Sequence, residues 1–217
     1  MTRAHEFTAW LVDLDGTLYH ALPIRMAMAC SLAGAGWRVI RVIRHFRREQ
    51  ERLRQERPEL PGANPFECQL RRTAACLGLE TDSVRSVIQC WMFDRPARWF
   101  RVFQRTKLIG SIRQFRERGG RTALVSDYPA RQKLNALGVA DLFDAVVACG
   151  EPQGPCRLKP DPEGVLLAAQ LLAVAPSACL VIGDRWDVDR ETACRANMAF
   201  ADAHLRRVVW PVSPLIA

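Results

Sequence analysis

Two acidic side chains with a spacing suited to chemistry lie near the start of the chain. Asp13 and Asp15 belong to the segment DLDGTL, residues 13–18, which directly follows an apolar run. Side chains two positions apart at the end of a strand point to nearly the same side. Two such carboxylates can bind Mg²⁺, which prefers oxygen ligands, and can divide the roles of nucleophile and acid/base. By itself the pair is equally consistent with a surface turn or a helix cap.

Further polar residues follow other apolar runs. Ser126 ends one run and Asp184 ends another. Four runs have the length and composition of buried strands: residues 7–12, 121–125, 143–148 and 178–182. Helical patterns separate the later runs, at residues 108–118, 130–137 and 162–173. This alternation predicts a parallel sheet with helices on its faces, and ligands bind such sheets at the carboxyl ends of the strands.

Four segments together resemble the motifs of the haloacid dehalogenase-like (HAD) superfamily. DLDGTL resembles the first motif, and LVSD at residues 124–127 resembles the second. KPDP at residues 159–162 resembles the third, and VIGD at residues 181–184, with Asp187 and Asp189, resembles the fourth. The motifs occur in the expected order, and their combination is more specific than any one of them.

Residues 20–105 interrupt the alternation of strands and helices. Helical patterns cover residues 26–53 and 74–93, with a Pro/Gly-rich interruption at residues 58–65. We therefore predict an α/β fold: a Rossmann-like, HAD-like core of residues 1–19 and 106–217, with an inserted all-helical cap of residues 20–105. The resemblance implies that such a cap closes over the site and favours small phosphate esters.

The resemblance also implies catalytic roles for Asp13 and Asp15. Asp13 would attack phosphorus and form an aspartyl-phosphate, while Asp15 would protonate the leaving group and then accept a proton from water. Dehalogenases of the superfamily lack an aspartate two residues after the nucleophile. Asp15 therefore favours phosphoryl transfer, and the expected activity is that of a phosphatase, a phosphomonoester hydrolase.

Residues of the first three motifs are expected to bind the phosphate group: Thr17, Ser126, Asp127 and Lys159. Ser126 would donate a hydrogen bond, and Lys159 would neutralise charge on the phosphate and on the nucleophile. Asp127 stands where the motif often has asparagine, and we expect only its backbone N–H to face the ligand. In isolation, a serine at a strand end or a solvated lysine would need no functional interpretation.

Mg²⁺ is the expected cofactor. Its implied ligands are the carboxylates of Asp13 and Asp184 and the backbone carbonyl of Asp15. The fourth motif leaves open which acidic residue completes it. Asp189 fits a wider-spaced form of the motif and is favoured as the carboxylate next to the ligands, whereas Asp187 would contact a metal-bound water or cap a helix.

Basic and aromatic residues mark the predicted cap. Five arginines recur every three or four residues and so share one helix face: Arg38, Arg41, Arg44, Arg48 and Arg52. The simpler interpretation is that these arginines form a solvated charged face. The functional hypothesis is that they attract a polyanionic substrate.

The aromatic stretch at residues 91–103 is better explained by core or hinge packing than by ligand stacking. Tyr19 and His20, where the chain enters the cap, are candidates for substrate contact, although a lone histidine there is more often structural.

Composition limits the partners. The net charge of +8 favours anions in general, and we expect a small phosphate ester rather than nucleic acid or an acidic membrane surface. The eight cysteines show no zinc-ligand spacing, which predicts reduced, mostly buried thiols. The first residues lack a signal pattern, and the apolar stretch at residues 26–36 is too short to span a bilayer, so a cytoplasmic protein is expected.

Two alternatives to a phosphatase stay open. A phosphomutase would share all four motifs and return the phosphoryl group to its substrate. A catalytically silent binding module would use the basic face of the cap, although the complete set of motif residues favours an enzyme. The sequence identifies neither the substrate nor the oligomeric state.

Overall fold

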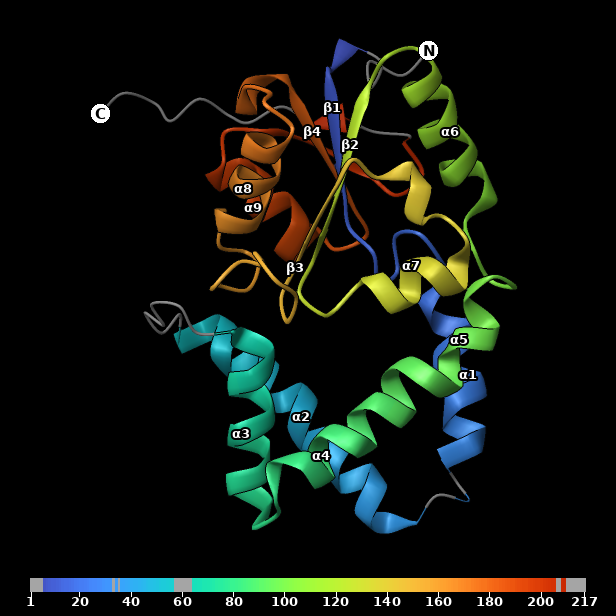
Figure 1. Cartoon of the computed structure of the whole chain (residues 1–217), viewed down its shortest axis with the longest axis vertical. Coiled ribbons are helices and arrows are strands. Elements are labelled where there is room, and N and C mark those ends of the chain that lie inside the picture. The colour runs from blue at the N-terminus through green and yellow to red at the C-terminus, as the bar shows by residue number, and fades with distance from the viewer. Residues whose placement is uncertain (1–5, 33, 35, 57–63, 206–207, 210–217) are drawn as a thin grey trace.

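The computed structural model describes residues 6–32, 34, 36–56, 64–205 and 208–209. Figure 1 shows a sheet flanked by helices in the upper half and a group of helices below it. The strands are β1 (Ala9–Val12), β2 (Arg121–Ser126), β3 (Ala145–Ala148), β4 (Cys179–Gly183), β5 (Ala199–Asp202) and β6 (Val208–Val209). Their order is β3-β2-β1-β4-β5-β6, with β1 to β5 parallel and β6 antiparallel to β5. The predicted α/β class with a Rossmann-like parallel sheet is confirmed.

Alternating side chains of the strands build two hydrophobic layers. On β1, Trp10 and Val12 face one layer, whereas Ala9 and Leu11 face the other. Helices α6 (Thr106–Glu117) and α7 (Arg131–Leu137) cover the first face, and α8 (Glu163–Leu171) and α9 (Glu191–Arg195) cover the second. The Trp10 ring stacks on Phe115 of α6 with centroids 4.2 Å apart. Burial on both faces explains why the strands are apolar runs without alternation.

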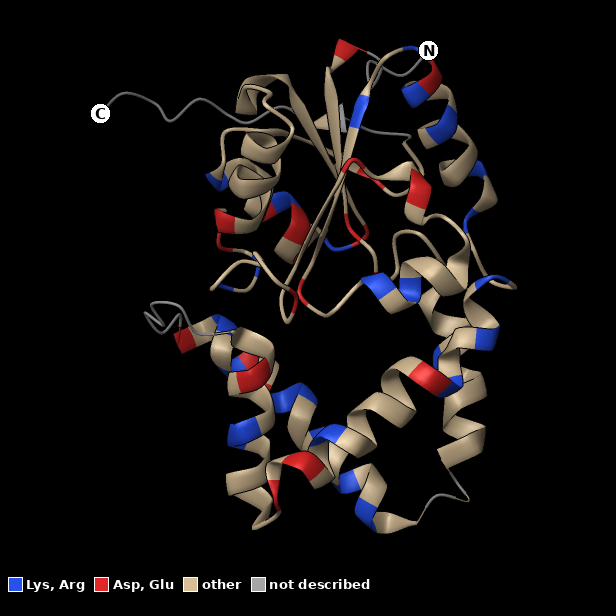
Figure 2. Ribbon diagram, viewed as in Figure 1, with Lys and Arg blue, Asp and Glu red and all other residues tan. Residues whose placement is uncertain are grey.

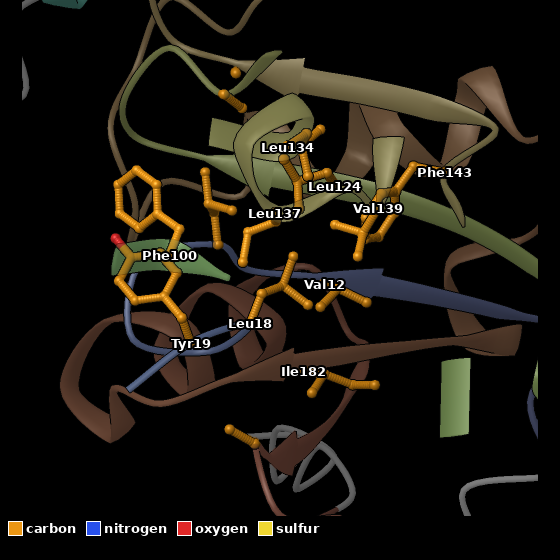
Figure 3. Close-up of a cluster of buried hydrophobic side chains, with 14 of the residues drawn as sticks. Val12, Leu18, Tyr19, Phe100, Leu124, Leu134, Leu137, Val139, Phe143 and Ile182 are labelled. Atoms are coloured by element: carbon orange, nitrogen blue, oxygen red, sulfur yellow. The ribbon is translucent and has the colours of Figure 1, made fainter. Parts of the chain in front are cut away.

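Helix α7 is fixed to the sheet by its leucines. Figure 3 shows Leu134 and Leu137 beside Val12 of β1 and Leu124 of β2. All four side chains are at most 2% exposed. This packing holds the helix that follows β2 in one place relative to the strand ends.

The remaining α-helices and one π-helical segment form a separate group, here called the helical module: α1 (Ala21–Leu32), α2 (Trp37–Glu56), α3 (Pro65–Leu77), α4 (Thr81–Ile88), the π-helical segment (Gln89–Asp94) and α5 (Arg95–Phe100). Residues 26–53 and 74–93, where helical patterns were predicted, are largely helical, but neither range is one helix. The first range spans parts of α1 and α2. The second spans the end of α3, all of α4 and most of the π-helical segment, and Gly78 ends α3 in the left-handed region at φ +63°. Of the Pro/Gly-rich interruption predicted at residues 58–65, residues 58–63 lie outside the described residues.

Two connections join the module to the sheet, and they run side by side. The N–H of His20 donates to the carbonyl of Phe103 (2.8 Å), and the N–H of Arg105 donates to the carbonyl of Leu18 (2.8 Å). The limits at residues 19/20 and 105/106 stay predictions. Trp91, Phe93 and Phe100 are buried in the layer that continues from the sheet into the module, so the core-packing interpretation is confirmed.

The five arginines predicted to share a face of α2 are all exposed, and Figure 2 shows basic residues recurring along this helix.

All eight cysteines are free thiols, but only Cys149 and Cys179 are buried, so the prediction of mostly buried thiols was wrong. Within the described ranges, every helix is too short or too polar to cross a membrane.

Phe46 of α2 joins the module to the core, and its loss should destabilise the protein. Its ring is fully buried, with centroids 5.8 Å from Phe66 of α3 and 6.1 Å from Tyr128 of the loop after β2. We expect Phe46→Ala to lower the free energy of unfolding by about 3–5 kcal/mol because it leaves a cavity. Trp37→Ala, on the same helix but 63% exposed, should change it by less than about 0.5 kcal/mol. Urea denaturation of both variants measures the difference, and equal effects would contradict the packing described.

Candidate active site

The site lies where the chain changes direction in the sheet. From β1 the chain builds β2 and β3 outward on one side, then returns to place β4 on the other side of β1. In open parallel sheets ligands bind at the carboxyl ends of the strands on either side of such a reversal, which here are β1 and β4. Asp13 follows β1 and Asp184 follows β4, and the N–H of Asp13 donates to the carbonyl of Ile182 (2.8 Å). Figure 1 shows the helical module facing this edge of the sheet.

Both carboxylate oxygens of Asp13 are held by buried groups. Lys159 Nζ lies 2.5 Å from Asp13 Oδ1 and 2.7 Å from Asp189 Oδ1. The hydroxyl of Thr17 donates to Asp13 Oδ2 (2.9 Å). Thr17, predicted to bind phosphate, therefore contacts the nucleophile candidate itself. Asp13 and Lys159 are each less than 10% exposed, so the contacts form in a region of low dielectric constant.

Three carboxylates gather around this point. Asp13, Asp184 and Asp189 each offer an oxygen, and these oxygens all lie within 4.8 Å of one another. Burial raises the pKa of Asp13 to about 8, with Lys159 opposing the shift and Asp189 adding to it. Partial burial and the charge of Asp189 likewise raise the pKa of Asp184. Three carboxyl groups with one ammonium group among them offer several oxygen donors and, once ionised, a net negative charge, and both features fit a hard divalent cation.

Gly16 makes room for Asp184 at this cluster. Its φ is +99°, a conformation that other residues rarely adopt. A Cβ atom on Gly16 would lie 2.1 Å from Asp184 Oδ2, well inside contact distance. The glycine of the first motif thus lets the turn after β1 approach the carboxylate after β4.

Asp15 points to a different set of partners. Lys133 Nζ of α7 lies 2.6 and 2.8 Å from its two carboxylate oxygens, and the Tyr19 hydroxyl donates to the same carboxylate. Burial acts to raise the pKa of Asp15, but the charge and hydrogen bonds of Lys133, helped by Tyr19, outweigh it and lower the pKa. Tyr19, a candidate for substrate contact, is here a partner of Asp15.

Ser126 is the last residue of β2, and Asp127 follows it. Ser126 is 2% exposed, and its Oγ accepts the N–H of Tyr128 (3.2 Å), which leaves the hydroxyl proton able to donate. Asp127 Oδ1 accepts the N–H of Lys159 (3.0 Å), and Oδ2 pairs with Arg54 of α2 (2.7 Å). The Asp127 carboxylate thus links the loop of the third motif to the helical module. Its backbone N–H remains the group predicted to face a ligand.

The two candidates in the fourth motif lie in different environments. Asp189 is 2% exposed and accepts both Lys159 Nζ and the N–H of Arg185 (3.1 Å). Asp187 is exposed and pairs with the Arg185 side chain (2.6 Å). That hydrogen bond lowers the pKa of Asp187. Only Asp189 joins the carboxylates of Asp13 and Asp184.

Sequence reasoning missed Lys133 and Arg54. Lys133 is one basic residue in an amphipathic helix, and nothing in its spacing relates it to Asp15. Arg54 lies outside the predicted row of arginines, and its side chain is only 9% exposed because α2 packs against the loop after β2. Burial lowers the pKa of Arg54 and the charge of Asp127 raises it, with an upward net shift. Only the placement of the module on the core brings this pair together.

Taken together, the site offers a nucleophile with a cation beside it, a separate carboxylate for proton transfer, and oxygen ligands for a divalent metal ion. The hydroxyl of Ser126, at the end of β2, and the ammonium group of Lys159, between β3 and α8, can bind an anion. This combination suits transfer of a phosphoryl group to Asp13.

Comparison with known proteins agrees with this chemistry. Residues 7–197 match the family of haloacid dehalogenase-like hydrolases. A protein named phosphoglycolate phosphatase from Cereibacter sphaeroides (strain ATCC 17025 / ATH 2.4.3) is 29% identical over 202 residues, covering 87% of this chain and 81% of that protein.

Solved structures share the fold. A HAD phosphatase from Thermococcus onnurineus aligns with a TM-score of 0.53 at 19% identity, over 89% of this chain and 85% of that one. A 2-haloacid dehalogenase from Pseudomonas syringae pv. Tomato DC3000 aligns with a TM-score of 0.59 at 19% identity, over 96% and 91%. The likeness of these structures concerns the fold alone, but the family match spans nearly the whole described chain. The chain therefore belongs to the haloacid dehalogenase-like hydrolases.

Proposed function

We propose that this protein is a Mg²⁺-dependent phosphomonoester hydrolase that acts through an aspartyl-phosphate on a small phosphorylated metabolite. The observation that carries the proposal is the contact of Lys159 with Asp13 beside two further carboxylates, Asp184 and Asp189. Asp15 supplies the proton-transfer group that the chemistry needs. The relatives named phosphoglycolate phosphatase support the same class of reaction.

In the first half of the reaction Asp13 is the nucleophile. One of its carboxylate oxygens forms a bond to phosphorus as the bond between phosphorus and the ester oxygen breaks. Lys159 stabilises the negative charge of the transferred group, and Ser126 donates a hydrogen bond to it. Asp15, in its protonated form, delivers its proton to the departing oxygen.

In the second half Asp15 is a base. It accepts a proton from a water molecule as the water oxygen attacks the phosphorus of the aspartyl-phosphate. The bond between phosphorus and Asp13 breaks, which frees inorganic phosphate and restores the carboxylate. Thr17 holds Asp13 in the orientation needed for the next cycle.

The side chains of Asp13 and Asp184, with the backbone carbonyl of Asp15, would hold the Mg²⁺ ion, and Asp189 would orient Lys159 beside them. When bound, the ion supplies positive charge that stabilises the phosphoryl oxygens. Asp187, which pairs with Arg185 at the surface, takes no part in this proposal.

The substrate we propose is small. The helical module faces the strand ends, and Arg54 and Gln50 of α2 contact Asp127 and Tyr128 there, at 2.7 and 2.6 Å. A module held this closely to the core favours a compact ester over a macromolecule. Because the relatives are named for phosphoglycolate, 2-phosphoglycolate is the first ester to test.

Loss of the nucleophile should abolish turnover. The wild-type protein with Mg²⁺ should release inorganic phosphate from 2-phosphoglycolate or from 4-nitrophenyl phosphate, and EDTA should stop the release. Asp13→Asn should lower kcat by at least about a thousandfold, because an amide cannot form the aspartyl-phosphate. Asp82→Asn, at an exposed carboxylate of α4, is the control and should retain full activity. Turnover by Asp13→Asn at the wild-type rate would refute the proposed mechanism.

A side chain at Gly16 should weaken metal binding by displacing Asp184. Gly16→Ala places a methyl group where Asp184 Oδ2 lies, and we expect the Kd for Mg²⁺ to rise at least about tenfold. Gly119→Ala is a matched control, because Gly119 also has a positive φ (+87°) but its Cβ would meet no described atom within 4 Å. Isothermal titration calorimetry compares the two. Similar Kd changes in both variants would show that backbone strain, and not contact with Asp184, is responsible.

Metal binding should strengthen as pH rises toward 8. In the metal-free protein Asp13 keeps its proton to about pH 8, whereas in the unfolded chain it ionises near pH ~4. In EDTA the free energy of unfolding should therefore fall as the pH rises from about 4 to about 8. Mg²⁺ competes with the proton, so the rise in Tm that it causes should be larger at pH 8 than at pH 6. A pH-independent rise in the wild type, or an equally pH-dependent rise in Asp13→Asn, would contradict this assignment.

A further inference from the structure

Lys133 is a buried charged group that the proposed chemistry does not yet use. Its side chain is 3% exposed, and its ammonium group contacts both carboxylate oxygens of Asp15. It also lies 5.0 Å from the ring centre of Phe93 and 5.4 Å from that of Tyr128. Phe93 belongs to the helical module and Tyr128 to the loop after β2, so three separate segments surround this one ammonium group.

A structural role alone does not require a lysine here. Removing an ammonium group from water costs free energy, and an apolar side chain of similar length would fill the same space without that cost. What a lysine adds at this position is a positive charge and hydrogen-bond donors. Its two hydrogen bonds both go to the carboxylate of Asp15. Short α7 is fixed by Leu134 and Leu137 against the sheet, so Lys133 projects from a rigid support.

Asp15 lies in the turn after β1, and its side chain is 30% exposed. The hydrogen bonds that hold its carboxylate come from Tyr19 and Lys133. The Tyr19 hydroxyl holds one carboxylate oxygen, whereas Lys133 holds both. Proton transfer requires the carboxyl group within hydrogen-bond distance of the reacting oxygen, so its orientation governs the rate.

We propose that Lys133 is a positioning residue that orients Asp15 for proton transfer, an inference that rests on the proposed phosphatase function. Lys133 acts through Asp15 and does not contact the reacting atoms. Its loss should therefore affect the steps in which Asp15 moves a proton and spare the steps in which it does not.

The test uses 4-nitrophenyl phosphate, whose leaving group departs without protonation. For this ester kcat/KM reports formation of the aspartyl-phosphate, and kcat includes its hydrolysis, which needs the base. We expect Lys133→Met to lower kcat about 100-fold and to leave kcat/KM within about threefold of the wild type. The first turnover should then show a burst of nitrophenolate, because the intermediate accumulates.

A double-mutant cycle separates this role from a structural one. If Lys133 acts through Asp15, then Lys133→Met should change kcat less than about threefold in a protein that already carries Asp15→Asn. The double variant removes both charges of the pair, so it remains informative if Lys133→Met alone folds poorly. Tyr19→Phe, which removes one hydrogen bond and no charge, should lower kcat less than Lys133→Met does.

Two outcomes would overturn the inference. Equal losses of kcat and kcat/KM without a burst, or multiplicative effects of Lys133→Met and Asp15→Asn, would place Lys133 in substrate binding or in the fold. These outcomes leave the phosphatase proposal intact. A wild-type protein that released no nitrophenolate and no phosphate from any ester would instead overturn the phosphatase proposal, and the role of Lys133 with it.

Discussion

The buried ammonium group of Lys159 is the contact on which the site depends. It joins the carboxylate after β1 to a carboxylate in the π-helical segment after β4 (Trp186–Arg190), at 2.5 Å from Asp13 and 2.7 Å from Asp189. Without it, the buried carboxylates of Asp13 and Asp189 would repel each other with little screening by water. Burial lowers the pKa of Lys159 while Asp13 and Asp189 raise it, and the net shift is upward, so it stays charged.

The same residue connects the site to the helical module through its backbone. The N–H of Lys159 donates to Asp127, whose other carboxylate oxygen pairs with Arg54 of α2. Asp127 places a negative charge near the expected phosphate site, where the motif often has asparagine. Arg54, from a helix distant in the chain, balances that charge. Breaking the ion pair with Arg54 would leave the mostly buried carboxylate of Asp127 without its cationic partner, which is costly.

Residues fixed by local chemistry could be predicted from the sequence, and residues fixed by packing could not. The strands were recognisable because burial on both faces makes them apolar throughout, and Asp13 and Asp184 follow from where such strands end. Strand β5 was missed because Ala199–Asp202 is short and half alanine. The pairing of Lys133 with Asp15 depends on how α7 lies across the sheet, and no local pattern encodes that placement.

Asp15 shows how the parts constrain one another. Its partners come from the connection into the helical module, which holds Tyr19, and from α7 of the core, which holds Lys133. Phe93 of the module packs against the same ammonium group. Asp15, the residue proposed to transfer the proton, is thus supported at the junction of core and module, whereas Asp13 is held by Thr17 and Lys159 of the core. The position of the module should therefore bear more directly on Asp15, which contacts Tyr19 at the entry to the module, than on Asp13, which is linked to the module only through Lys159, Asp127 and Arg54.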